Sequence, residues 1–285
     1  MIDGICCVGS AHIDIIARQN GTHGIDQTGE VSVSVGGTAY NVACNLRHFG
    51  VNVALVTVIK DSIFGNIVLD KLKSYGIVTD WVIEDSGIPE SVFIAVHGSD
   101  RLITAVNNLS VDKFHITNFP RANAYFVDLN NSVETLRSIL ARQKPVYIGL
   151  VSEEKAVRLA TLLEIESPSC IQCVSGNKSE YAALLKVLNL ASPEELSSCY
   201  PDVEFIYTMH EKGLKVLKTG KVVYEAQGID ANKVPYINGS RHIMGTGDAF
   251  IAGYIYAREI KSMEVSNAVD YAMANAVLLK LVTPG

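Results

Sequence analysis

Apolar runs and amphipathic segments alternate along almost the whole chain. Short apolar runs, each typical of a buried strand, occupy residues 5–8, 51–58, 124–129, 146–151, 170–174 and 205–209. Segments with apolar residues at helical spacing lie at about 39–49, 63–75, 132–142, 153–164 and 177–189, and two more start near Gly247 and Met263. The alternation predicts an α/β fold whose central, mostly parallel sheet is sandwiched by helices.

Two segments follow a different pattern. Residues 31–35 alternate strictly between Val and Ser, which is typical of a strand with one wet face. Residues 91–97 and 102–106 have the pattern of two strands joined in a hairpin. We therefore expect β segments within about 11–35 and 91–106 to form a separate small sheet. The chain shows no interdomain linker or tandem repeat, so residues 1–285 are interpreted as a single domain that includes this sheet.

Composition and charge argue against several classes of protein. The chain has 24 Lys and Arg against 30 Asp and Glu, and this net charge of -6 disfavours a protein that coats nucleic acid or anionic lipid. No apolar run approaches the roughly 18 residues that a membrane span needs. The first residues, Met1 to Gly4, lack the basic start and apolar stretch of a secretory signal. We therefore expect a cytoplasmic protein that binds neither nucleic acid nor membrane.

The spacing of Cys170 and Cys173 is that of a zinc or redox pair. Both lie in a predicted strand, and strand residues three apart face opposite sides of a sheet, so the two sulfurs should diverge. No second Cys or His pair follows at metal spacing. We interpret both as buried small apolar residues, with a structural zinc site as the alternative.

The sharpest chemical feature is the run from Gly245 to Phe250, Gly-Thr-Gly-Asp-Ala-Phe, which opens a helical pattern. Its glycines allow a tight turn, and the amides at such a helix start favour anionic oxygen. Asp248, in the first turn, could accept a proton from a substrate hydroxyl beside that anion site, the combination that phosphoryl transfer needs. The alternative is that Asp248 only complements the helix macrodipole.

This run resembles the GAGDAF signature of the PfkB, or ribokinase-like, carbohydrate and nucleoside kinases. Three further motifs follow the order of that family: residues 36–43, Gly-Gly-Thr-Ala-Tyr-Asn-Val-Ala, with Gly50 closing the helix; residues 177–180, Asn-Lys-Ser-Glu; and residues 274–276, Ala-Asn-Ala. The resemblance covers essentially the whole chain. It implies a ribokinase-like fold in which the small sheet is a lid, and a kinase that uses ATP and Mg²⁺.

Within the family, the chain resembles the pseudouridine kinases. Residues 9–14, Gly-Ser-Ala-His-Ile-Asp, are similar to their opening GSANID, and residues 105–108 occupy the place of an AIND-like segment. Residues 144–155 resemble their PVFVDPVSxxK stretch. These softer matches favour a nucleoside-like ribosyl acceptor over a free sugar.

The resemblance implies roles around the acceptor. Asp248 would be the base that deprotonates the acceptor hydroxyl. Backbone donors around the transferred phosphoryl group would come from Gly245, Thr246 and Gly247. The sugar hydroxyls would be held by Asp14, Gly37 and Asn41, with His12 and Asn107 as helpers. A carboxylate suits a vicinal diol because it accepts two hydrogen bonds, whereas an amide donates and accepts at once.

The resemblance also implies roles around the nucleotide. Mg²⁺, phosphates and intervening water would be organised by Asn177 and Glu180, with Glu180 reaching the metal through water. The nucleotide would be bordered by Thr208, Gly213 and Asn275. Other interpretations stay open: Asp14 could solvate a strand end, Asn41 could be a neutral surface residue, and Glu180 could serve only the helix macrodipole.

Several positions depart from the family pattern. His242 stands where an Asp or Asn usually helps to bind a monovalent cation, which leaves potassium activation open; Ile59 and His210 replace glycines; and Tyr40 and Gly149 replace an Arg and an Asp of the pseudouridine kinases. A Cβ at residue 210 would hinder backbone that relatives place at positive φ. The family normally continues past the position of Gly285, so a shortened chain is one interpretation.

These observations predict a kinase that transfers the γ-phosphate of ATP to the primary hydroxyl of a ribosyl compound, with pseudouridine as the leading acceptor. A sugar kinase of the ribose or fructose type is one alternative. A non-catalytic nucleoside- or sugar-binding relative is the other, because of the changes at residues 59, 210 and 242. By resemblance we also expect a homodimer that forms through the β-lid.

Overall fold

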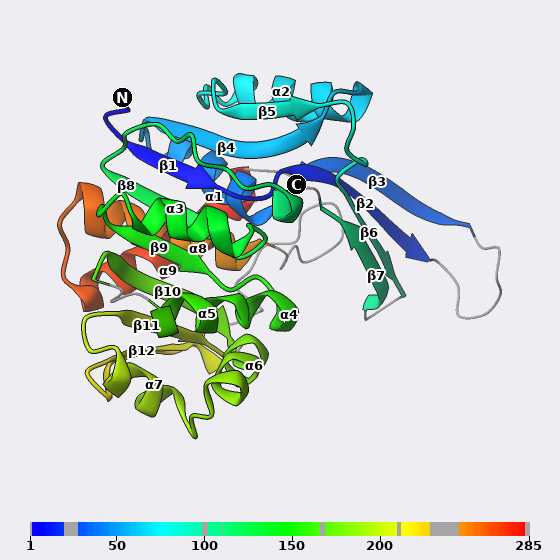
Figure 1. The fold of residues 1–285 in the computed structure, drawn as a ribbon. Helices are drawn as coiled ribbons and strands as arrows, with labels where there is room; N and C mark the ends of the chain where they lie inside the picture. The colour runs from blue at the N-terminus through cyan, green and yellow to red at the C-terminus, as the bar shows by residue number, and fades with distance from the viewer. Residues whose placement is uncertain are drawn as a thin grey trace.

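Two sheets organise the chain in the computed structural model, which describes residues 2–19, 28–98, 102–109, 111–165, 169–209, 212–228 and 245–282. The large sheet has the strand order β13-β12-β11-β10-β9-β8-β1-β4-β5, and the small sheet has the order β3-β2-β6-β7 (Figure 1). The fold class is therefore the predicted one, α/β with a smaller separate sheet.

The middle of the large sheet is parallel, as predicted. Its strands are β1 (Ile5–Val8), β4 (Val53–Lys60), β5 (Val82–Asp85), β8 (Ala124–Asp128), β9 (Val146–Gly149), β10 (Ile171–Asn177), β11 (Glu204–Thr208), β12 (Leu214–Lys218) and β13 (Lys221–Ala226). All neighbours from β5 across to β11 pair in parallel, whereas β12 and β13 add an antiparallel hairpin at one edge. The parallel strands are covered on both faces, which explains their nearly continuous apolar sequences.

Helices cover both faces of the large sheet. One face carries α1 (Thr38–His48), α2 (Ile63–Ser74), α8 (Thr246–Ile255), the π-helix η4 (Tyr256–Ile260) and α9 (Val265–Val282). The other face carries α3 (Val133–Leu140), α4 (Glu153–Ala156), α5 (Arg158–Ile165), α6 (Lys178–Leu188) and α7 (Pro193–Cys199). Leu46 and Tyr254 belong to the first buried core, and Leu136 and Tyr181 to the second. No helix of the described residues is long and apolar enough to cross a membrane.

The small sheet extends from the side of the large sheet at which β1 ends (Figure 1). Its strands are β2 (His12–Gln19), β3 (Gly29–Gly36), β6 (Val92–His97) and β7 (Leu102–Asn108). The antiparallel pairing of β6 with β7 confirms the predicted hairpin. Between β7 and β8 the chain returns to the large sheet through the short helix η1 (Val111–Lys113).

The two closely spaced cysteines face opposite layers. Cys173 belongs to the core beneath α1 and α8, whereas Cys170, just before β10, belongs to the core beneath α3 to α7. Both side chains are buried free thiols, so the predicted divergence of the two sulfurs is confirmed. Burial raises the pKa of Cys173 well above its ordinary value, which keeps this thiol protonated and unreactive.

Candidate active site

The glycine-rich run forms the start of α8. Gly245 precedes the helix with φ 76° and ψ 6°, a left-handed conformation that glycine adopts without strain. Among the described residues no side chain caps this helix, and its first helical bond runs from the Ala249 amide to the Gly245 carbonyl at 3.0 Å. A Cβ added to Gly247 would meet no atom of the described residues within 4 Å. One flank of the turn is therefore open in this part of the chain, beside a helix N-terminus that favours an anion.

Asp248 lies in the first turn of α8 and contacts a residue from the amino-terminal part of the chain. Helix α1 packs against α8, and Asn41 Nδ2 donates to Asp248 Oδ2 at 2.8 Å. Both side chains are half-buried. Because an amide donor is held at one oxygen, the carboxylate has a defined orientation at the start of the helix. The structure thus brings together two of the predicted site residues from opposite ends of the sequence.

A polar row crosses the small sheet. Asp14 on β2 lies opposite Phe93 on β6, and Phe93 lies opposite Asn107 on β7, so the three side chains share one face. His12 Nε2 lies 3.0 Å from Asp14 Oδ1, with the two side chains 10% and 18% exposed, so the pair is sheltered yet reachable. A Cβ on Gly36 would overlap the Asp14 carboxylate, so a side chain at residue 36 would displace that carboxylate from its present position.

Tyr40 lies beside this row and is buried. Burial first, then the neighbouring Cys44 and, more weakly, the Asp14 carboxylate raise the pKa of Tyr40 far above its ordinary value. The phenol is therefore neutral. Pseudouridine kinases often carry a positively charged Arg at this position, whereas this chain has the uncharged phenol of Tyr40.

Asn177 and Glu180 form a reciprocal cap at the start of α6. Asn177 Oδ1 accepts from the Glu180 amide at 3.0 Å, and Glu180 Oε2 accepts from the Asn177 amide at 2.8 Å. Glu180 Oε1 also accepts from Asn177 Nδ2 at 2.8 Å. Since both carboxylate oxygens already hold Asn177, Glu180 fits a metal ion through water better than by direct contact. The capping role is thus present, and the metal role stays a prediction.

Thr208 and Gly213 lie next to this cap. Thr208 is the register partner of Asn177 between β10 and β11, and its Oγ1 donates to the Gly176 carbonyl at 3.1 Å. Gly213 has φ +95°, and a Cβ there would overlap the Ala226 carbonyl oxygen, so this turn requires glycine. The structure therefore brings residues 177–180 together with Thr208 and Gly213 at the carboxyl ends of β10 and β11.

The remaining predicted positions are less closely joined. Asn275 Nδ2 donates to the Tyr271 carbonyl at 2.8 Å within α9, a contact that does not link it to Thr208 or Gly213. Ile59 is buried on β4. His210, His242 and Gly285 lie outside the described residues.

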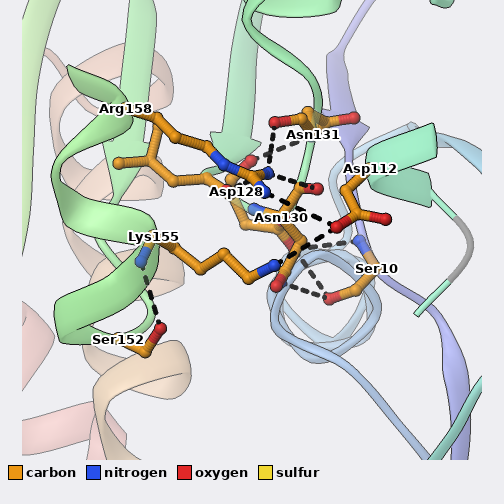
Figure 2. Close-up of polar contacts among 9 residues, drawn as sticks. Ser10, Asp112, Asp128, Asn130, Asn131, Ser152, Lys155 and Arg158 are labelled. Carbon is orange, nitrogen blue, oxygen red and sulfur yellow. Dashed lines mark hydrogen bonds and ion pairs between the residues drawn. The ribbon is translucent and has the colours of Figure 1, made fainter. Parts of the chain in front are cut away.

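Sequence patterns did not reveal Phe93 or the buried Asp128. Asp128 ends β8, and Figure 2 shows Ser10, Asn130 and Asn131 gathered around it. One signal was present: an acidic residue interrupts the apolar run 124–129, near the carboxyl end of a predicted parallel strand, where sites of α/β sheets form. The partners of Asp128 depend on the spatial order of strands, which the sequence does not state.

Solved structures share this fold over nearly the whole chain. A nucleoside kinase from Burkholderia thailandensis, solved in complex with inosine, superposes with a TM-score of 0.79 at 16% identity, covering 99% of this chain and 90% of that chain. A ribokinase from Arabidopsis thaliana, solved with ribose and ATP, superposes with a TM-score of 0.75 at 16% identity, covering 100% of this chain and 94% of that chain. The fold is therefore ribokinase-like.

Two sequence relatives from Escherichia coli match most of the chain. A pseudouridine kinase is 23% identical, over 97% of this chain and 96% of the relative. An uncharacterized sugar kinase, YeiI, is 24% identical, over 93% of this chain and 73% of the relative. Both relatives are named as kinases, and the names differ in the acceptor.

A carboxylate held by Asn41 at the start of α8, on a ribokinase-like fold, fits kinases that phosphorylate a hydroxyl group. The profile described as "pfkB family carbohydrate kinase" matches residues 3–280. The chain belongs to this family, as its motifs predicted, and is a phosphotransferase with an alcohol group as acceptor. Membership implies ATP as phosphoryl donor and a small sugar or nucleoside as acceptor.

Proposed function

We propose that this protein transfers the γ-phosphoryl group of ATP to the primary hydroxyl of a ribosyl compound, and that pseudouridine is the leading acceptor. The observation that carries the proposal is the contact between Asn41 and Asp248 at the start of α8, whose first turn has one flank open within the described residues. The similarity to a pseudouridine kinase supports the choice of acceptor.

Asp248 takes the proton of the acceptor hydroxyl. Asn41 holds one oxygen of its carboxylate, so the basic group keeps its direction while the hydroxyl approaches. Backbone amides at Gly245, Thr246 and Gly247 and the positive end of the helix dipole stabilise the negative charge on the transferred phosphoryl group.

The small sheet binds the acceptor. Asp14 accepts hydrogen bonds from the ribosyl hydroxyls, and Gly37 and Asn41 lie at the adjoining start of α1. His12 Nε2 lies 3.0 Å from Asp14 Oδ1, and Asn107 lies two strands away on the same face. Phe93, between them, offers an aromatic surface on which a base or sugar ring can rest.

ATP supplies the phosphoryl group, and a bound Mg²⁺ would supply positive charge beside its phosphates. Asn177 and Glu180 would reach the metal through water, because the Glu180 oxygens are already bonded to Asn177. Thr208, Gly213 and Asn275 border the nucleotide.

Residues 1–285 act as one catalytic domain in the cytoplasm, with the small sheet as its lid. Closure of the lid over the acceptor excludes water, which otherwise competes for the phosphoryl group. A homodimer that forms through the lid is part of the proposal.

The test is ADP release by wild-type protein and by Asp248→Asn, with pseudouridine, uridine, adenosine, ribose, fructose and fructose 6-phosphate as acceptors. We expect release with pseudouridine, and we expect Asp248→Asn to lower kcat by roughly 10²–10⁴-fold while ATP affinity stays nearly unchanged. Unchanged turnover in the variant would show that Asp248 is not the base.

The same panel separates the alternatives. ADP release only with the free sugars would identify a sugar kinase, the class in which the second relative is named. Acceptor binding without ADP release would identify a protein that binds the acceptor and has lost turnover.

A further inference from the structure

The start of α1 is capped by residues from two distant parts of the chain. Gly37 occupies the N-cap with φ 114° and makes no side-chain cap. The Thr38 amide donates instead to Ser10 Oγ at 3.1 Å, the Ala39 amide to Asp128 Oδ2 at 3.1 Å, and the Tyr40 amide to the Ser10 carbonyl at 3.1 Å. Three amides that a helix leaves without intrahelical acceptors are thus satisfied over long range.

Asp128 is the centre of this cap (Figure 2). Its side chain is fully buried, and Oδ2 accepts from the Ser10 amide at 2.9 Å and from Ser10 Oγ at 2.8 Å, besides the Ala39 amide. Oδ1 accepts from the Asn130 amide at 3.0 Å. A buried carboxylate is costly unless hydrogen bonds compensate it, and here four donors and the positive end of α1 surround it.

The neighbouring residues leave this carboxyl group little freedom. A Cβ on Gly9, which has φ +149°, would overlap the Asp128 carboxyl group, so the chain passes close against it. Arg158 braces the turn after β8 from the other side, because one guanidinium nitrogen donates to the carbonyls of Leu129, Asn130 and Asn131 at 3.1, 3.0 and 2.8 Å (Figure 2). Asp128 therefore lies between a fixed strand end and the start of α1.

We propose that Asp128 is a positioning residue for phosphoryl transfer, which acts through the start of α1 on Asn41 and thereby on the orientation of Asp248. Asn41 follows the capped residues directly, and its amide donates to the Gly37 carbonyl at 2.8 Å in the first turn of α1. The side chain of Asn41 then donates to Asp248 at 2.8 Å. The inference rests on the proposed function, since it assigns the base to Asp248.

The same turn offers a matched control. Asn131 is fully buried and donates to the carbonyls of Val8 at 3.0 Å and Asp128 at 2.9 Å, so it joins β1 to β8. These contacts do not involve α1. A role limited to stability predicts similar behaviour for variants of Asp128 and Asn131, whereas a positioning role separates them.

The kinetic test is a double-mutant cycle between Asp128→Asn and Asn41→Ala, with Asn131→Ala as control. The amide at residue 128 keeps the shape of the carboxylate but removes its charge and one acceptor. We expect Asp128→Asn to lower kcat by about tenfold with a nearly unchanged KM for ATP. In the Asn41→Ala background we expect less than about a twofold further loss, because the route to Asp248 is already removed. Asn131→Ala should lower the melting temperature and leave kcat within about twofold of wild type. Equal losses in both backgrounds would overturn the inference.

Hydrogen exchange gives a second readout that needs no activity. In Asp128→Asn the amides of residues 38–40 should exchange faster than in wild type, and in Asn131→Ala they should not. If Asp128→Asn does not fold, Ser10→Ala, which removes only the hydroxyl contacts, takes its place with a smaller effect of the same sign. Unaltered exchange at residues 38–40 would overturn the inference even if the kinase activity is confirmed. If these amides exchange faster in Asp128→Asn but the wild-type protein phosphorylates no acceptor, Asp128 caps α1 and the proposed kinase function is wrong.

Discussion

At the scale of residues, the site depends on where side chains are absent as much as on where they are present. Gly245 gives α8 a left-handed start, and Gly247 leaves the flank of the first turn open within the described residues. Asp248 is then the first side chain of the helix that can project a charge beside that open flank. The glycines and the carboxylate therefore act as one unit, which a methyl group would disturb.

Gly247→Ala should raise stability and lower activity. Replacing glycine by alanine in a helix stabilises it by about 0.5–1 kcal/mol when the new methyl meets no other atom. The same methyl would lie beside the proposed anion site, so we expect kcat to fall by at least about tenfold, equivalent to ~1.4 kcal/mol of transition-state stabilisation.

Urea unfolding and ADP release on the same preparation measure the two effects of Gly247→Ala. Asn131→Ala, which should lower stability and leave kcat nearly unchanged, is a control for the assay. A variant that is more stable and fully active would show that phosphoryl oxygens do not approach this flank.

Residues whose role follows from local conformation could be predicted from the sequence. Gly37, Gly213 and Gly245 were identified because a motif demanded glycine, and all three have positive φ. Phe93 and Asp128 were missed for a physical reason: Phe93 reaches Asp14 only through the parallel pairing of β2 with β6, and Asp128 reaches α1 only because β8 lies beside β1. Strand order in space is a property of the whole fold.

At the scale of elements, the amphipathic pattern identified the strands and helices of the parallel core. It missed β5, α7 and the hairpin of β12 and β13. That hairpin carries Lys215, Lys218 and Lys221 between apolar residues and lies at an edge with one wet face, so it lacks the continuous apolar run of its neighbours. Helix α7 has only 7 residues, too few to show a helical period.

The reciprocal cap of α6 allows the two roles of Glu180 to be separated. Glutamine keeps the shape of the side chain and one accepting oxygen, which can take the bond from the Asn177 amide, but it removes the charge and the acceptor for Asn177 Nδ2. Glu180→Gln should therefore lower the free energy of unfolding by about 1 kcal/mol. The Mg²⁺ concentration for half-maximal activity should rise by about tenfold, as expected for the loss of a charged partner of metal-bound water.

Helix α7 provides the matched control for Glu180→Gln. Glu195 holds the corresponding position there: its amide donates to Ser192 Oγ at 3.2 Å, and its Oε2 accepts from the Ala191 amide at 2.6 Å. Glu195→Gln should leave both stability and Mg²⁺ dependence nearly unchanged. If Glu180→Gln gives the same Mg²⁺ dependence as this control, Glu180 only caps the helix.

At the scale of the whole molecule, the small sheet presents an uncharged apolar face. Val33, Ile15, Ile94 and Val106 lie side by side across β3, β2, β6 and β7, on the face opposite to Asp14 and Asn107. Val33 is 59% and Val106 is 66% exposed, so the ends of this row are open to solvent in a single chain. An apolar face without charge matches a copy of itself under twofold symmetry, which supports the lid as the dimer contact.

Lysines at both ends of this row should separate the proposed homodimer. In Val33→Lys combined with Val106→Lys, each copy would bring positive charges against an apolar partner surface, so we expect a monomer at micromolar concentration where wild type sediments as a dimer. Val223→Lys is the matched control, because Val223 is also an exposed valine in a strand. It is 47% exposed and lies on β13, at the far edge of the large sheet. This variant should sediment as wild type does.

If dimerisation also stiffens the lid, the double variant should raise the KM for the acceptor more than the KM for ATP, since the apolar row lies on the back of the sheet face that carries Asp14. If the wild-type protein is already a monomer at that concentration, the proposed dimer contact through the lid is wrong. The proposed site at Asp248 does not depend on that contact.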